Sequence, residues 1–451
     1  MSAQRKNAIT VVKADTRQRL AECLTEDDID ACEEALLQCS QNESPRAELG
    51  PFPCLGASPC GARPGRGSLS GQERTLSRAS VLSVAPRWFV RDYLAIKEIL
   101  FSSWFNLLLV CVPLGTASGL LGWGAVPTFT LNFLALIPLA LILGDVTEDL
   151  AVRFGDVVGG LVNATFGNVV EIMVSLFALY KNLFDVVAFS LLGSILSNLL
   201  LVLGSSFLLG GLYHPVQTFN AVSNRACSSL LMLAVVGICI PSAASMVLVD
   251  DPGLRPDWIL DVSRGTAVIM LVCYLCYLAF QLHTHSDLFR CEGEEEALPM
   301  LSLGSSLGLL AAITAVVAVA SEFLTASIQE VSAHTGMSQA FIGLIILPIA
   351  GNACEHLTAC IVATRNKMDL SMGVAVGSSI QIALFAIPFN VVVGWASGHD
   401  FSLDFTPFSA MVLAVCVIHA NFVTADATSH WLLGVQLIAL YCVIAIAYFY
   451  K

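Results

Sequence analysis

Two short segments place an asparagine and a glutamate inside otherwise apolar runs, a combination that can bind cations. They are GNVVEI, which contains Gly167, Asn168 and Glu171, and GNACEH, which contains Gly351, Asn352 and Glu355. An ionised carboxylate near the bilayer centre costs roughly 2.5–3.5 kcal/mol on insertion scales, so such residues usually face a polar cavity and serve a function. In each segment the asparagine and the glutamate are three residues apart and share a helix face. Each segment therefore predicts a stripe of oxygen ligands, beside a glycine that lets another backbone approach closely.

The apolar run after each motif adds neutral oxygens, from Ser194, Ser197 and Asn198 in GSILSN and from Ser378 and Gln381 in GSSIQI. Carboxylate, amide and hydroxyl oxygens, with no cluster of thiolates or imidazoles, suit a hard cation such as Ca²⁺. Glu171 and Glu355 are the expected metal ligands, since together they neutralise one Ca²⁺. Without the ion the carboxylates repel each other and burial disfavours their ionisation, so the empty pair should take up protons. Competition between Ca²⁺ and protons for one site is the physical basis of cation/proton antiport.

Other interpretations of these residues stay open. Glu171 and Glu355 could pair with buried donors and only fix helix packing, although no lysine or arginine lies inside these spans to pair with them. His356 is either a proton-relay group beside Glu355 or a hydrogen-bonded bystander. The spacing does not rank Ca²⁺ against Mn²⁺ or Cd²⁺, because all of these cations tolerate oxygen ligands.

The elements that must position these residues are transmembrane helices. Of the 451 residues, 56% are hydrophobic and only 13% are charged, whereas a soluble domain carries about 25% charged residues. Many apolar runs are long enough to cross a hydrocarbon core of roughly 30 Å. The sequence predicts an all-α integral membrane fold with eleven spans, near 104–121, 127–144, 157–179, 184–210, 227–249, 263–284, 300–323, 338–363, 369–395, 404–421 and 431–450.

A single offset of 184 residues relates the two halves of the chain. Without a gap, it carries Gly159 to Gly343, Gly167 to Gly351, Glu171 to Glu355, Asn182 to Asn366 and Ser194 to Ser378. The two motifs fall in the third and eighth predicted spans, and this odd separation means that the copies enter the membrane from opposite sides. Such inverted repeats are typical of secondary transporters, whose substrate site lies near the bilayer midplane between the halves.

The remaining segments are arranged around these repeats. Residues 1–98 are expected to form a cytosolic, largely disordered tail, because they lack the apolar region of a signal peptide and include a Gly/Pro/Ser-rich stretch. Lysine and arginine flanking the spans are more frequent on the tail side, which also favours a cytosolic N-terminus. Residues 99–284 hold the first helix and first repeat, residues 285–299 an acidic cytosolic linker, and residues 300–451 the second repeat.

The net charge of −13 is concentrated in two acidic stretches, ECLTEDDIDACEEA in the tail and CEGEEEA in the linker. Within the tail, Ser77 and Ser80 follow arginines at the spacing of basophilic kinase substrates. Unmodified linkers share this pattern, so a kinase partner and an unmodified tail are both open. The lipid bilayer is an expected partner, nucleic acid is not, and homo-oligomerisation is left open.

These motifs and their flanks resemble the cation/proton exchanger family within the calcium/cation antiporter superfamily. The resemblance runs from about residue 94 to residue 450 and includes KEILFSSWFNLLLVCVPLG, GGLVNATFGNVVEI, GSILSNLLLVLG, LPIAGNACEH and GSSIQIALF. It implies a peripheral first helix plus two five-helix inverted repeats. It also implies exchange of cytosolic Ca²⁺ for luminal H⁺ at a vacuolar or similar acidic-organelle membrane. In this resemblance Glu171 and Glu355 match the family's central acidic pair, with Asn168 and Asn352 beside them.

The resemblance extends to acidic residues outside the paired motifs. The family carries an acidic helix between the sixth and seventh spans, where this chain has the short segment that holds Glu292, Glu294, Glu295 and Glu296. These residues are either Ca²⁺ contacts or a solvated charge run. Glu148 and Glu322 resemble acidic residues near the ion entrances and are candidates for the proton path, as is His356.

Four other functions compete with proton-coupled exchange. A sodium-driven Ca²⁺ exchanger of the same superfamily would share the fold and the acidic pair, and an exchanger that prefers Mn²⁺ is a further alternative. A channel is disfavoured by the repeat of glycine-interrupted polar helices, because channels usually rely on rings of identical subunits or filter loops. An enzyme is not expected, since HExxH, P-loop and GxSxG motifs are not evident. No cofactor is expected, with Ca²⁺ and H⁺ as transported substrates.

Overall fold

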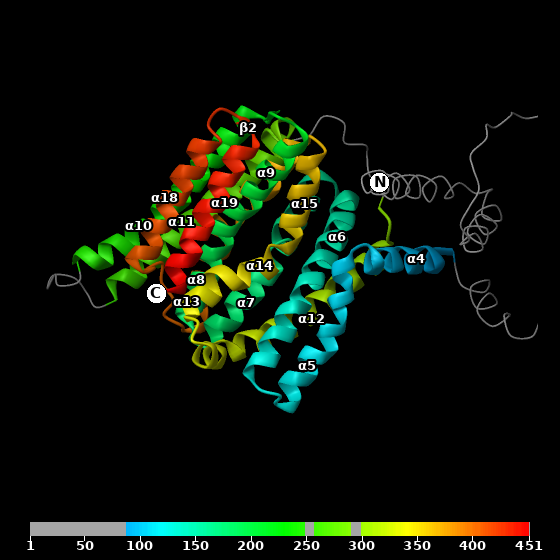
Figure 1. Ribbon diagram of the computed structural model, residues 1–451, viewed down its shortest axis with the longest axis horizontal. Helices are drawn as coiled ribbons and strands as arrows, with labels where there is room; N and C mark the ends of the chain where they lie inside the picture. Colours follow the sequence, from blue (N-terminus) through cyan, green and yellow to red (C-terminus); the bar gives the residue numbers. More distant parts are fainter. Residues whose placement is uncertain (1–86, 249–256, 290–298, 451) are drawn as a thin grey trace, which may run out of the picture. The chain divides into compact units, whose positions relative to one another are not determined.

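The computed structural model describes residues 87–248, 257–289 and 299–450, and this part of the chain is almost entirely helical (Figure 1). The compact unit that contains it begins at Pro86, earlier than the predicted tail boundary at residue 98. The difference arises because residues 87–101 form a helix, α4, in which Ala95 and Ile99 are buried. The kinase-type serines Ser77 and Ser80 and the linker residues Glu292, Glu294, Glu295 and Glu296 lie outside the described residues.

The first half of the described chain runs from a surface helix into a series of apolar helices. Its elements are α4 (Arg87–Phe101), η1 (Trp104–Val110), α5 (Cys111–Leu121), α6 (Ala125–Phe166), α7 (Val169–Tyr180), α8 (Phe184–Leu196), η2 (Ser197–Val202), α9 (Leu203–Tyr213), β1 (Gln217–Thr218), α10 (Ala221–Leu248), α11 (Trp258–Ala279), η3 (Phe280–Thr284) and η4 (Ser286–Leu288). The elements η2 and η3 are π-helical, with wider turns than the α-helices around them.

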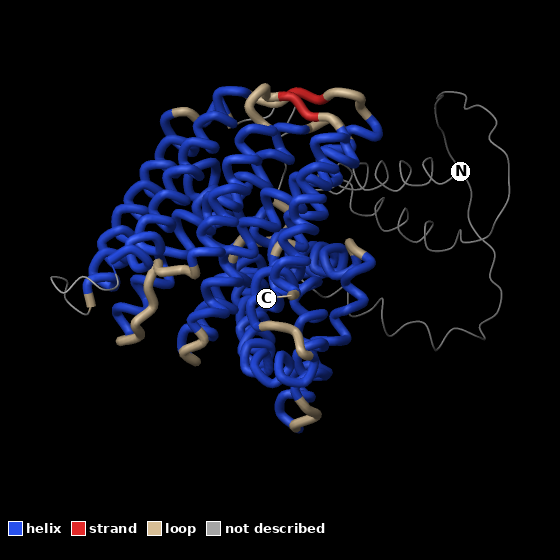
Figure 2. Tube along the Cα trace, turned by 60° about the vertical axis from the view of Figure 1, so that its left-hand side comes forward, coloured by secondary structure: helices blue, strands red, loops and turns tan. Residues whose placement is uncertain are grey.

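The second half repeats this succession. Its elements are α12 (Leu303–Thr335), α13 (Gln339–Phe341), η5 (Ile342–Ile346), α14 (Leu347–Gly351), α15 (Ala353–Thr364), α16 (Met368–Gln381), η6 (Ile382–Ala386), α17 (Ile387–Ser397), α18 (Pro407–Val423), β2 (Thr428–Ser429) and α19 (Trp431–Phe449). The two short strands pair antiparallel, with Gln217 opposite Ser429 and Thr218 opposite Thr428. They tie the connection before α10 to the connection before α19 at one end of the bundle (Figure 2).

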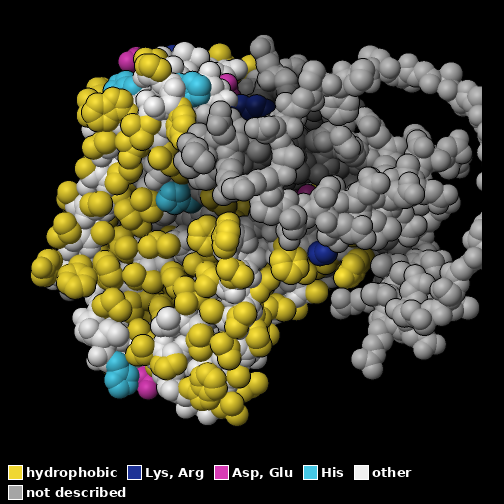
Figure 3. Space-filling view, turned by 45° about the vertical axis from the view of Figure 1, so that its right-hand side comes forward, with side chains coloured by type: hydrophobic (Ala, Val, Ile, Leu, Met, Phe, Trp, Pro, Cys, Tyr) yellow, Lys and Arg dark blue, Asp and Glu magenta, His cyan; other side chains and the backbone are white. Residues whose placement is uncertain are grey.

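The described helices suit a bilayer in length and polarity. Eight are long and apolar enough to cross a membrane, or nine if the bent pair Gln339–Gly351 and Ala353–Thr364 counts as one span. Two shorter apolar helices, Val169–Tyr180 and Pro407–Val423, lie at two further predicted positions. Hydrophobic side chains cover most of the described surface in view in Figure 3, as expected of a surface that faces lipid. The count of eleven and the inverted arrangement stay predictions.

Helix α6 contains a sharp reversal near its C-terminal end. Its membrane-length part ends at Phe154, and a β-carbon built on Gly159 would collide with the carbonyl oxygen of Ala151. In a straight helix, residues eight apart are about 12 Å apart, so the chain must fold back between these two positions. Residues 155–166 are therefore a separate limb that leads into α7.

The helices that carry the two motifs are interrupted at the asparagine of each motif. Asn168 has φ −107° and ψ 22°, and Asn352 has φ −86° and ψ 17°, both outside regular α-helix. The second break bends the chain by 58°. Neither asparagine side chain caps the helix that follows it, and both bond to residues in the other half of the chain instead. In each motif the asparagine therefore lies at the break, and the glutamate lies in the first turn of the helix that follows.

Matching local structures recur at the 184-residue offset. Asn182 and Asn366 both adopt the left-handed conformation, with φ of 57° and 61°, which asparagine tolerates better than most residues. The π-helical stretch η2 follows α8, and η6 follows α16, one residue from the matching position. The two halves therefore share backbone detail as well as sequence.

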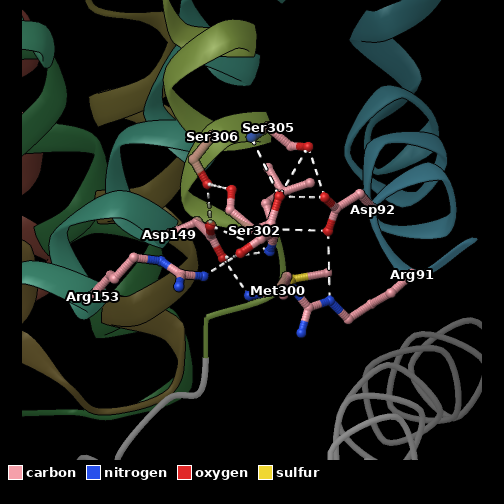
Figure 4. A network of polar contacts seen from close by, with 9 residues as sticks. Arg91, Asp92, Asp149, Arg153, Met300, Ser302, Ser305 and Ser306 are labelled. Atoms are coloured by element: carbon pink, nitrogen blue, oxygen red, sulfur yellow. Dashed lines mark hydrogen bonds and ion pairs between the residues drawn. The ribbon is translucent and has the colours of Figure 1, made fainter. Parts of the chain in front are cut away.

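The surface helix α4 is fastened to α6 and α12 by a polar network (Figure 4). Asp92 accepts hydrogen bonds from the backbone N–H of Ser302 (2.9 Å), the hydroxyl of Ser302 and the hydroxyl of Ser305 (2.7 Å). Asp149 of α6 accepts from the N–H of Met300 and from the hydroxyl of Ser306 (3.0 Å). Two carboxylates thus satisfy donors at the start of α12, where the helix dipole also favours negative charge.

Candidate functional site

Glu171 lies at the contact between the two halves of the chain. It occupies the first turn of α7 and is 8% exposed. A β-carbon built on Gly351 would lie 2.6 Å from its Oε1 atom, so the carboxylate rests directly against the backbone of the second motif. Neither carboxylate oxygen has a hydrogen-bond partner among the described residues. A buried carboxylate without donors indicates that a cation or a proton completes the site.

Glu355 occupies the corresponding first turn of α15, where it is half-buried. Its Oε2 atom is buried without a partner in the described part of the chain. No described lysine, arginine or histidine forms an ion pair with either glutamate. The interpretation that the two carboxylates only fix helix packing through buried cations therefore finds no support among these residues.

The predicted neutral ligands gather into two hydrogen-bonded groups that cross between the halves. Ser194 donates to Oδ1 of Asn352 at 2.7 Å, and the Asn352 amide donates to the backbone oxygen of Ser194 at 3.2 Å. In the corresponding group, Ser378 donates to Oδ1 of Asn168 at 3.1 Å. The 184-residue offset maps each of these serine–asparagine pairs onto the other. The structure thus brings together residues that the sequence placed far apart, while their role as ligands stays a prediction.

Two further predicted residues extend the second group. Asn198 donates from Nδ2 to the hydroxyl of Ser378 at 3.0 Å, and its own Oδ1 is buried without a described partner. Gln381 accepts a hydrogen bond from Nδ2 of Asn168. Ser197 in η2 is also buried, and among the described residues its hydroxyl makes no hydrogen bond to this group. Asn198 and Gln381 therefore add to the contacts that cross between the halves.

Two acidic residues and a histidine are the residues predicted for a proton path. Glu148 on α6 and Glu322 on α12 are exposed, and His356 on α15 is half-buried. The proton-relay and bystander interpretations of His356 both stay open. Among the described residues no group of three or more His, Cys, Asp and Glu side chains could hold a metal ion. Any cation here must therefore depend on two glutamates and on neutral oxygens.

The site is closed on one side and more open on the other. A β-carbon at Gly193 of α8 would collide with the backbone of Leu344, so η5 packs tightly on α8. The matching position on α16 is Gly377, and no described atom lies within 4 Å of a β-carbon there. Within an 18-residue apolar stretch of each span, 94% of the residues are buried in the span that contains α8 and 72% in the span that contains α16. We refer below to the α8 side as the closed side and to the α16 side as the open side.

A small cavity lies against Glu171 on the closed side. Its volume is about 20 Å³, enough for a single water molecule. Ser190 and Ser194 of α8 line it together with Gly351 and apolar side chains. The carboxylate therefore has room for water but little free volume in this arrangement.

One buried polar pair near the site was missed from the sequence. Asn390 of α17 donates from Nδ2 to the hydroxyl of Ser175 in α7 at 3.0 Å, and both residues are fully buried. Ser175 comes four residues after Glu171. The signal that could have found the pair is the one that marked the motifs, a lone amide in an apolar run, here AIPFNVVVGW.

The fold and the site together define a helical, polytopic membrane protein with an acidic, oxygen-lined site between two related halves. The family described as sodium/calcium exchanger protein matches residues 124–283 and 305–450, and the chain belongs to this family. The resemblance to cation/proton exchangers that the motifs predict is confirmed by its relatives.

Two relatives are similar over most of their lengths. The vacuolar calcium ion transporter of Schizosaccharomyces pombe is 44% identical over 357 residues, which cover 78% of this chain and 86% of that protein. The Ca²⁺/H⁺ antiporter of Synechocystis is 40% identical over 364 residues, which cover 77% of this chain and 97% of that protein.

Solved structures share the fold. The structure of native YfkE is 36% identical, has a TM-score of 0.66 and corresponds to 77% of this chain and 100% of that one. The crystal structure of an H⁺/Ca²⁺ exchanger named CAX is 13% identical with a TM-score of 0.54, covering 76% of this chain and 93% of that one. At this identity, the second comparison concerns the fold alone.

Proposed function

We propose that the protein exchanges cytosolic Ca²⁺ for luminal H⁺ across the membrane of a vacuole or a similar acidic organelle. The observation that carries the proposal is the pair Glu171 and Glu355, supplied by matching motifs and lacking cationic partners among the described residues. Relatives whose names state Ca²⁺/H⁺ antiport or vacuolar calcium transport support the choice of substrates and of membrane.

The exchange follows from competition at the two carboxylates. When Ca²⁺ is bound, the two glutamates neutralise it, and the amide and hydroxyl oxygens of the two hydrogen-bonded groups replace part of its hydration shell. When Ca²⁺ leaves, two like charges in a poorly hydrated site repel each other, so the pair takes up protons. Because the site carries either Ca²⁺ or protons, movement of one drives the other in the opposite direction.

Alternating access is proposed as the transport cycle. The closed side is held by η5 on α8, and the equivalent limb, residues 155–166, does not cover Gly377 of α16 in the same way. In the opposite-facing state the two limbs would exchange these roles, as the repeat symmetry suggests. With the N-terminus in the cytosol, the open side is the cytosolic one, from which Ca²⁺ would be loaded.

Uptake of radioactive calcium into vesicles that contain the purified protein tests this function. The vesicle interior is acidified, and neither ATP nor sodium is present. Proton-coupled exchange requires uptake that collapses when a protonophore dissipates the pH gradient and that is lost in Glu171→Gln and Glu355→Gln. The family description also includes sodium-coupled exchange. Uptake that appears only with an outward sodium gradient would contradict proton coupling and favour the sodium-driven alternative.

A further inference from the structure

Asn390 has the chemistry of a cation ligand but no role in the site described above. Its Nδ2 donates to Ser175 (3.0 Å) and to the backbone oxygen of Ala386 (2.8 Å). Its Oδ1 is fully buried and accepts no hydrogen bond from any described residue. Because a buried amide oxygen normally has a donor, this oxygen is an acceptor that a cation could use if one reached it.

Asn390 lies between the acidic pair and the closed side of the protein. Ser175 lies one helical turn beyond Glu171, on the same face of α7. The end of α7 turns directly into the start of α8, so this end lies on the closed side. Further along, a β-carbon on Gly394 of α17 would lie 3.6 Å from Leu179 of α7.

The seam between α7 and α17 then reaches the surface. Tyr180 and His399 meet there edge to face, with ring centroids 5.6 Å apart. Tyr180 is 55% exposed. Ser175 and Asn390 are therefore oxygens placed between the acidic pair and the surface of the closed side.

We propose that Ser175 and Asn390 form a further oxygen site, which coordinates Ca²⁺ between the acidic pair and the closed side when that side opens. This inference rests on the proposed exchange function. A hydroxyl and an amide oxygen can replace water around a hard cation. Without a carboxylate they bind it weakly enough for release, as a permeation step requires. The first half offers a counterpart, since the 184-residue offset maps Asn390 onto Ser206, which is also buried and polar.

Asn390 is not the only described residue with a buried amide oxygen that lacks a donor. A second such residue, Asn132, provides a matched control. Asn132 of α6 is fully buried, donates to Gly115 and Thr128, and also has a free Oδ1 among the described residues. Its hydrogen bonds go to α5 and to its own helix, and none goes to the two hydrogen-bonded groups of the site. A purely structural role for Asn390 predicts that Asn390→Leu and Asn132→Leu behave alike.

The test measures Ca²⁺ transport in both directions, in sealed vesicles in which the N-terminal tail of the protein faces outward. Cleavage of the tail by added protease verifies this orientation. A mutation of the carrier cannot change the overall equilibrium, so kcat/KM for Ca²⁺ must change equally in both directions. For Asn390→Leu we expect kcat to fall about tenfold, at unchanged KM, when Ca²⁺ enters from the open side. When Ca²⁺ enters from the closed side, KM should rise about tenfold at unchanged kcat. Ser175→Ala should show a smaller change of the same kind.

Other patterns would overturn the proposal. A fall of kcat in both directions at unchanged KM would assign Asn390 to the conformational change alone, and unchanged kinetics would remove it from the path. Asn390→Asp provides a second variant if Asn390→Leu does not fold, and its added charge should lower KM from the closed side. Wild-type uptake and its loss in Glu171→Gln are measured in the same vesicles. If the wild type takes up no Ca²⁺, or if Glu171→Gln still does, the exchange function itself is wrong. If both controls behave as expected but Asn390→Leu changes the kinetics in the same way in both directions, only the further site is rejected.

Discussion

Ser194 donates a 2.7 Å hydrogen bond to Asn352, and its counterpart in the other half of the chain is the 3.1 Å bond from Ser378 to Asn168. Each serine belongs to one half and each asparagine to the other. The asparagines also interrupt the helices that carry the two glutamates, so these bonds hold both helix breaks in place. The carboxylates are thereby positioned by contacts that cross between the halves.

These two bonds should be energetically coupled to Ca²⁺ binding. In a double-mutant cycle with Ser194→Ala and Asn352→Ala, the coupling should be about 1 kcal/mol in the free energy of Ca²⁺ binding. The cycle with Ser378→Ala and Asn168→Ala should give a similar value. Equilibrium binding of radioactive calcium to the purified protein measures both, and strictly additive effects would argue that the bonds do not position the ligands.

Gly351→Ala should weaken Ca²⁺ binding. The added methyl group would lie 2.6 Å from Oε1 of Glu171 and must displace the carboxylate. We expect a loss of affinity of about tenfold, which corresponds to about 1.4 kcal/mol. Gly308→Ala on α12 is the matched control, because no described atom lies within 4 Å of a β-carbon there. Equal affinities of the two variants in the calcium-binding assay would contradict direct contact between Gly351 and Glu171.

Gly377→Ala should slow transport without lowering the stability of the protein. The position is open in this arrangement, and alanine favours helix by up to about 1 kcal/mol over glycine, so the melting temperature should stay the same or rise. If the limb 155–166 packs on α16 in the opposite-facing state, the methyl group then obstructs it, and calcium uptake should slow about tenfold. Gly193→Ala should instead lower the melting temperature, since its methyl group meets Leu344 already. Full transport activity in Gly377→Ala would argue against an exchange of roles between the limbs.

The cap that Asp92 provides for α12 should be sensitive to acid. Burial raises the pKa of the Asp92 carboxyl, but hydrogen bonds from Ser302 and Ser305 and the nearby Arg91 outweigh this effect, so that the pKa lies below its ordinary value of 3.8. A pKa lower in the folded state means that the ionised group stabilises the fold above the unfolded pKa. This stabilisation is lost as the pH falls through the folded pKa.

Asp92→Asn should therefore cost about 1–2 kcal/mol of stability at neutral pH. The difference in melting temperature from the wild type should shrink below about pH 4. Thermal unfolding in detergent across this pH range measures it. The exposed Asp426, changed to Asn, serves as the control and should show no such difference. A melting-temperature deficit of Asp92→Asn that persists unchanged at pH 3 would mean that the charge of Asp92 is not what stabilises the start of α12.

The candidate site could be predicted because its residues contrast with their surroundings. Glu171 and Glu355 are acidic residues in apolar runs, and one fixed offset maps each onto the other. The same contrast marks Asn390, a lone amide in an apolar run. The helix breaks at Asn168 and Asn352 were less visible, since an asparagine can continue a helix as well as end one.

Other features carry no signal in a single sequence. The difference between Gly193 and Gly377 belongs to one state of a cycle, whereas the sequence treats the two halves alike. The contact of Asp92 with Ser302 joins residues more than 200 positions apart and follows no periodicity. Because α4 is short and only partly apolar, its attachment to the membrane helices depends on this contact and could not be inferred from hydropathy.

The polar network of Asp92 and Asp149 should allow the polypeptide to be divided into two fragments between α11 and α12. Both carboxylates lie before residues 290–298, and the donors that they bind lie just after them. The two sides of that segment are therefore held together by contacts other than the peptide chain itself. Residues 1–289 and 299–451, made as separate polypeptides in one cell, should find each other and rebuild a working transporter, as a fragment pair does. The amino group created at residue 299 would even add a positive charge beside the two aspartates.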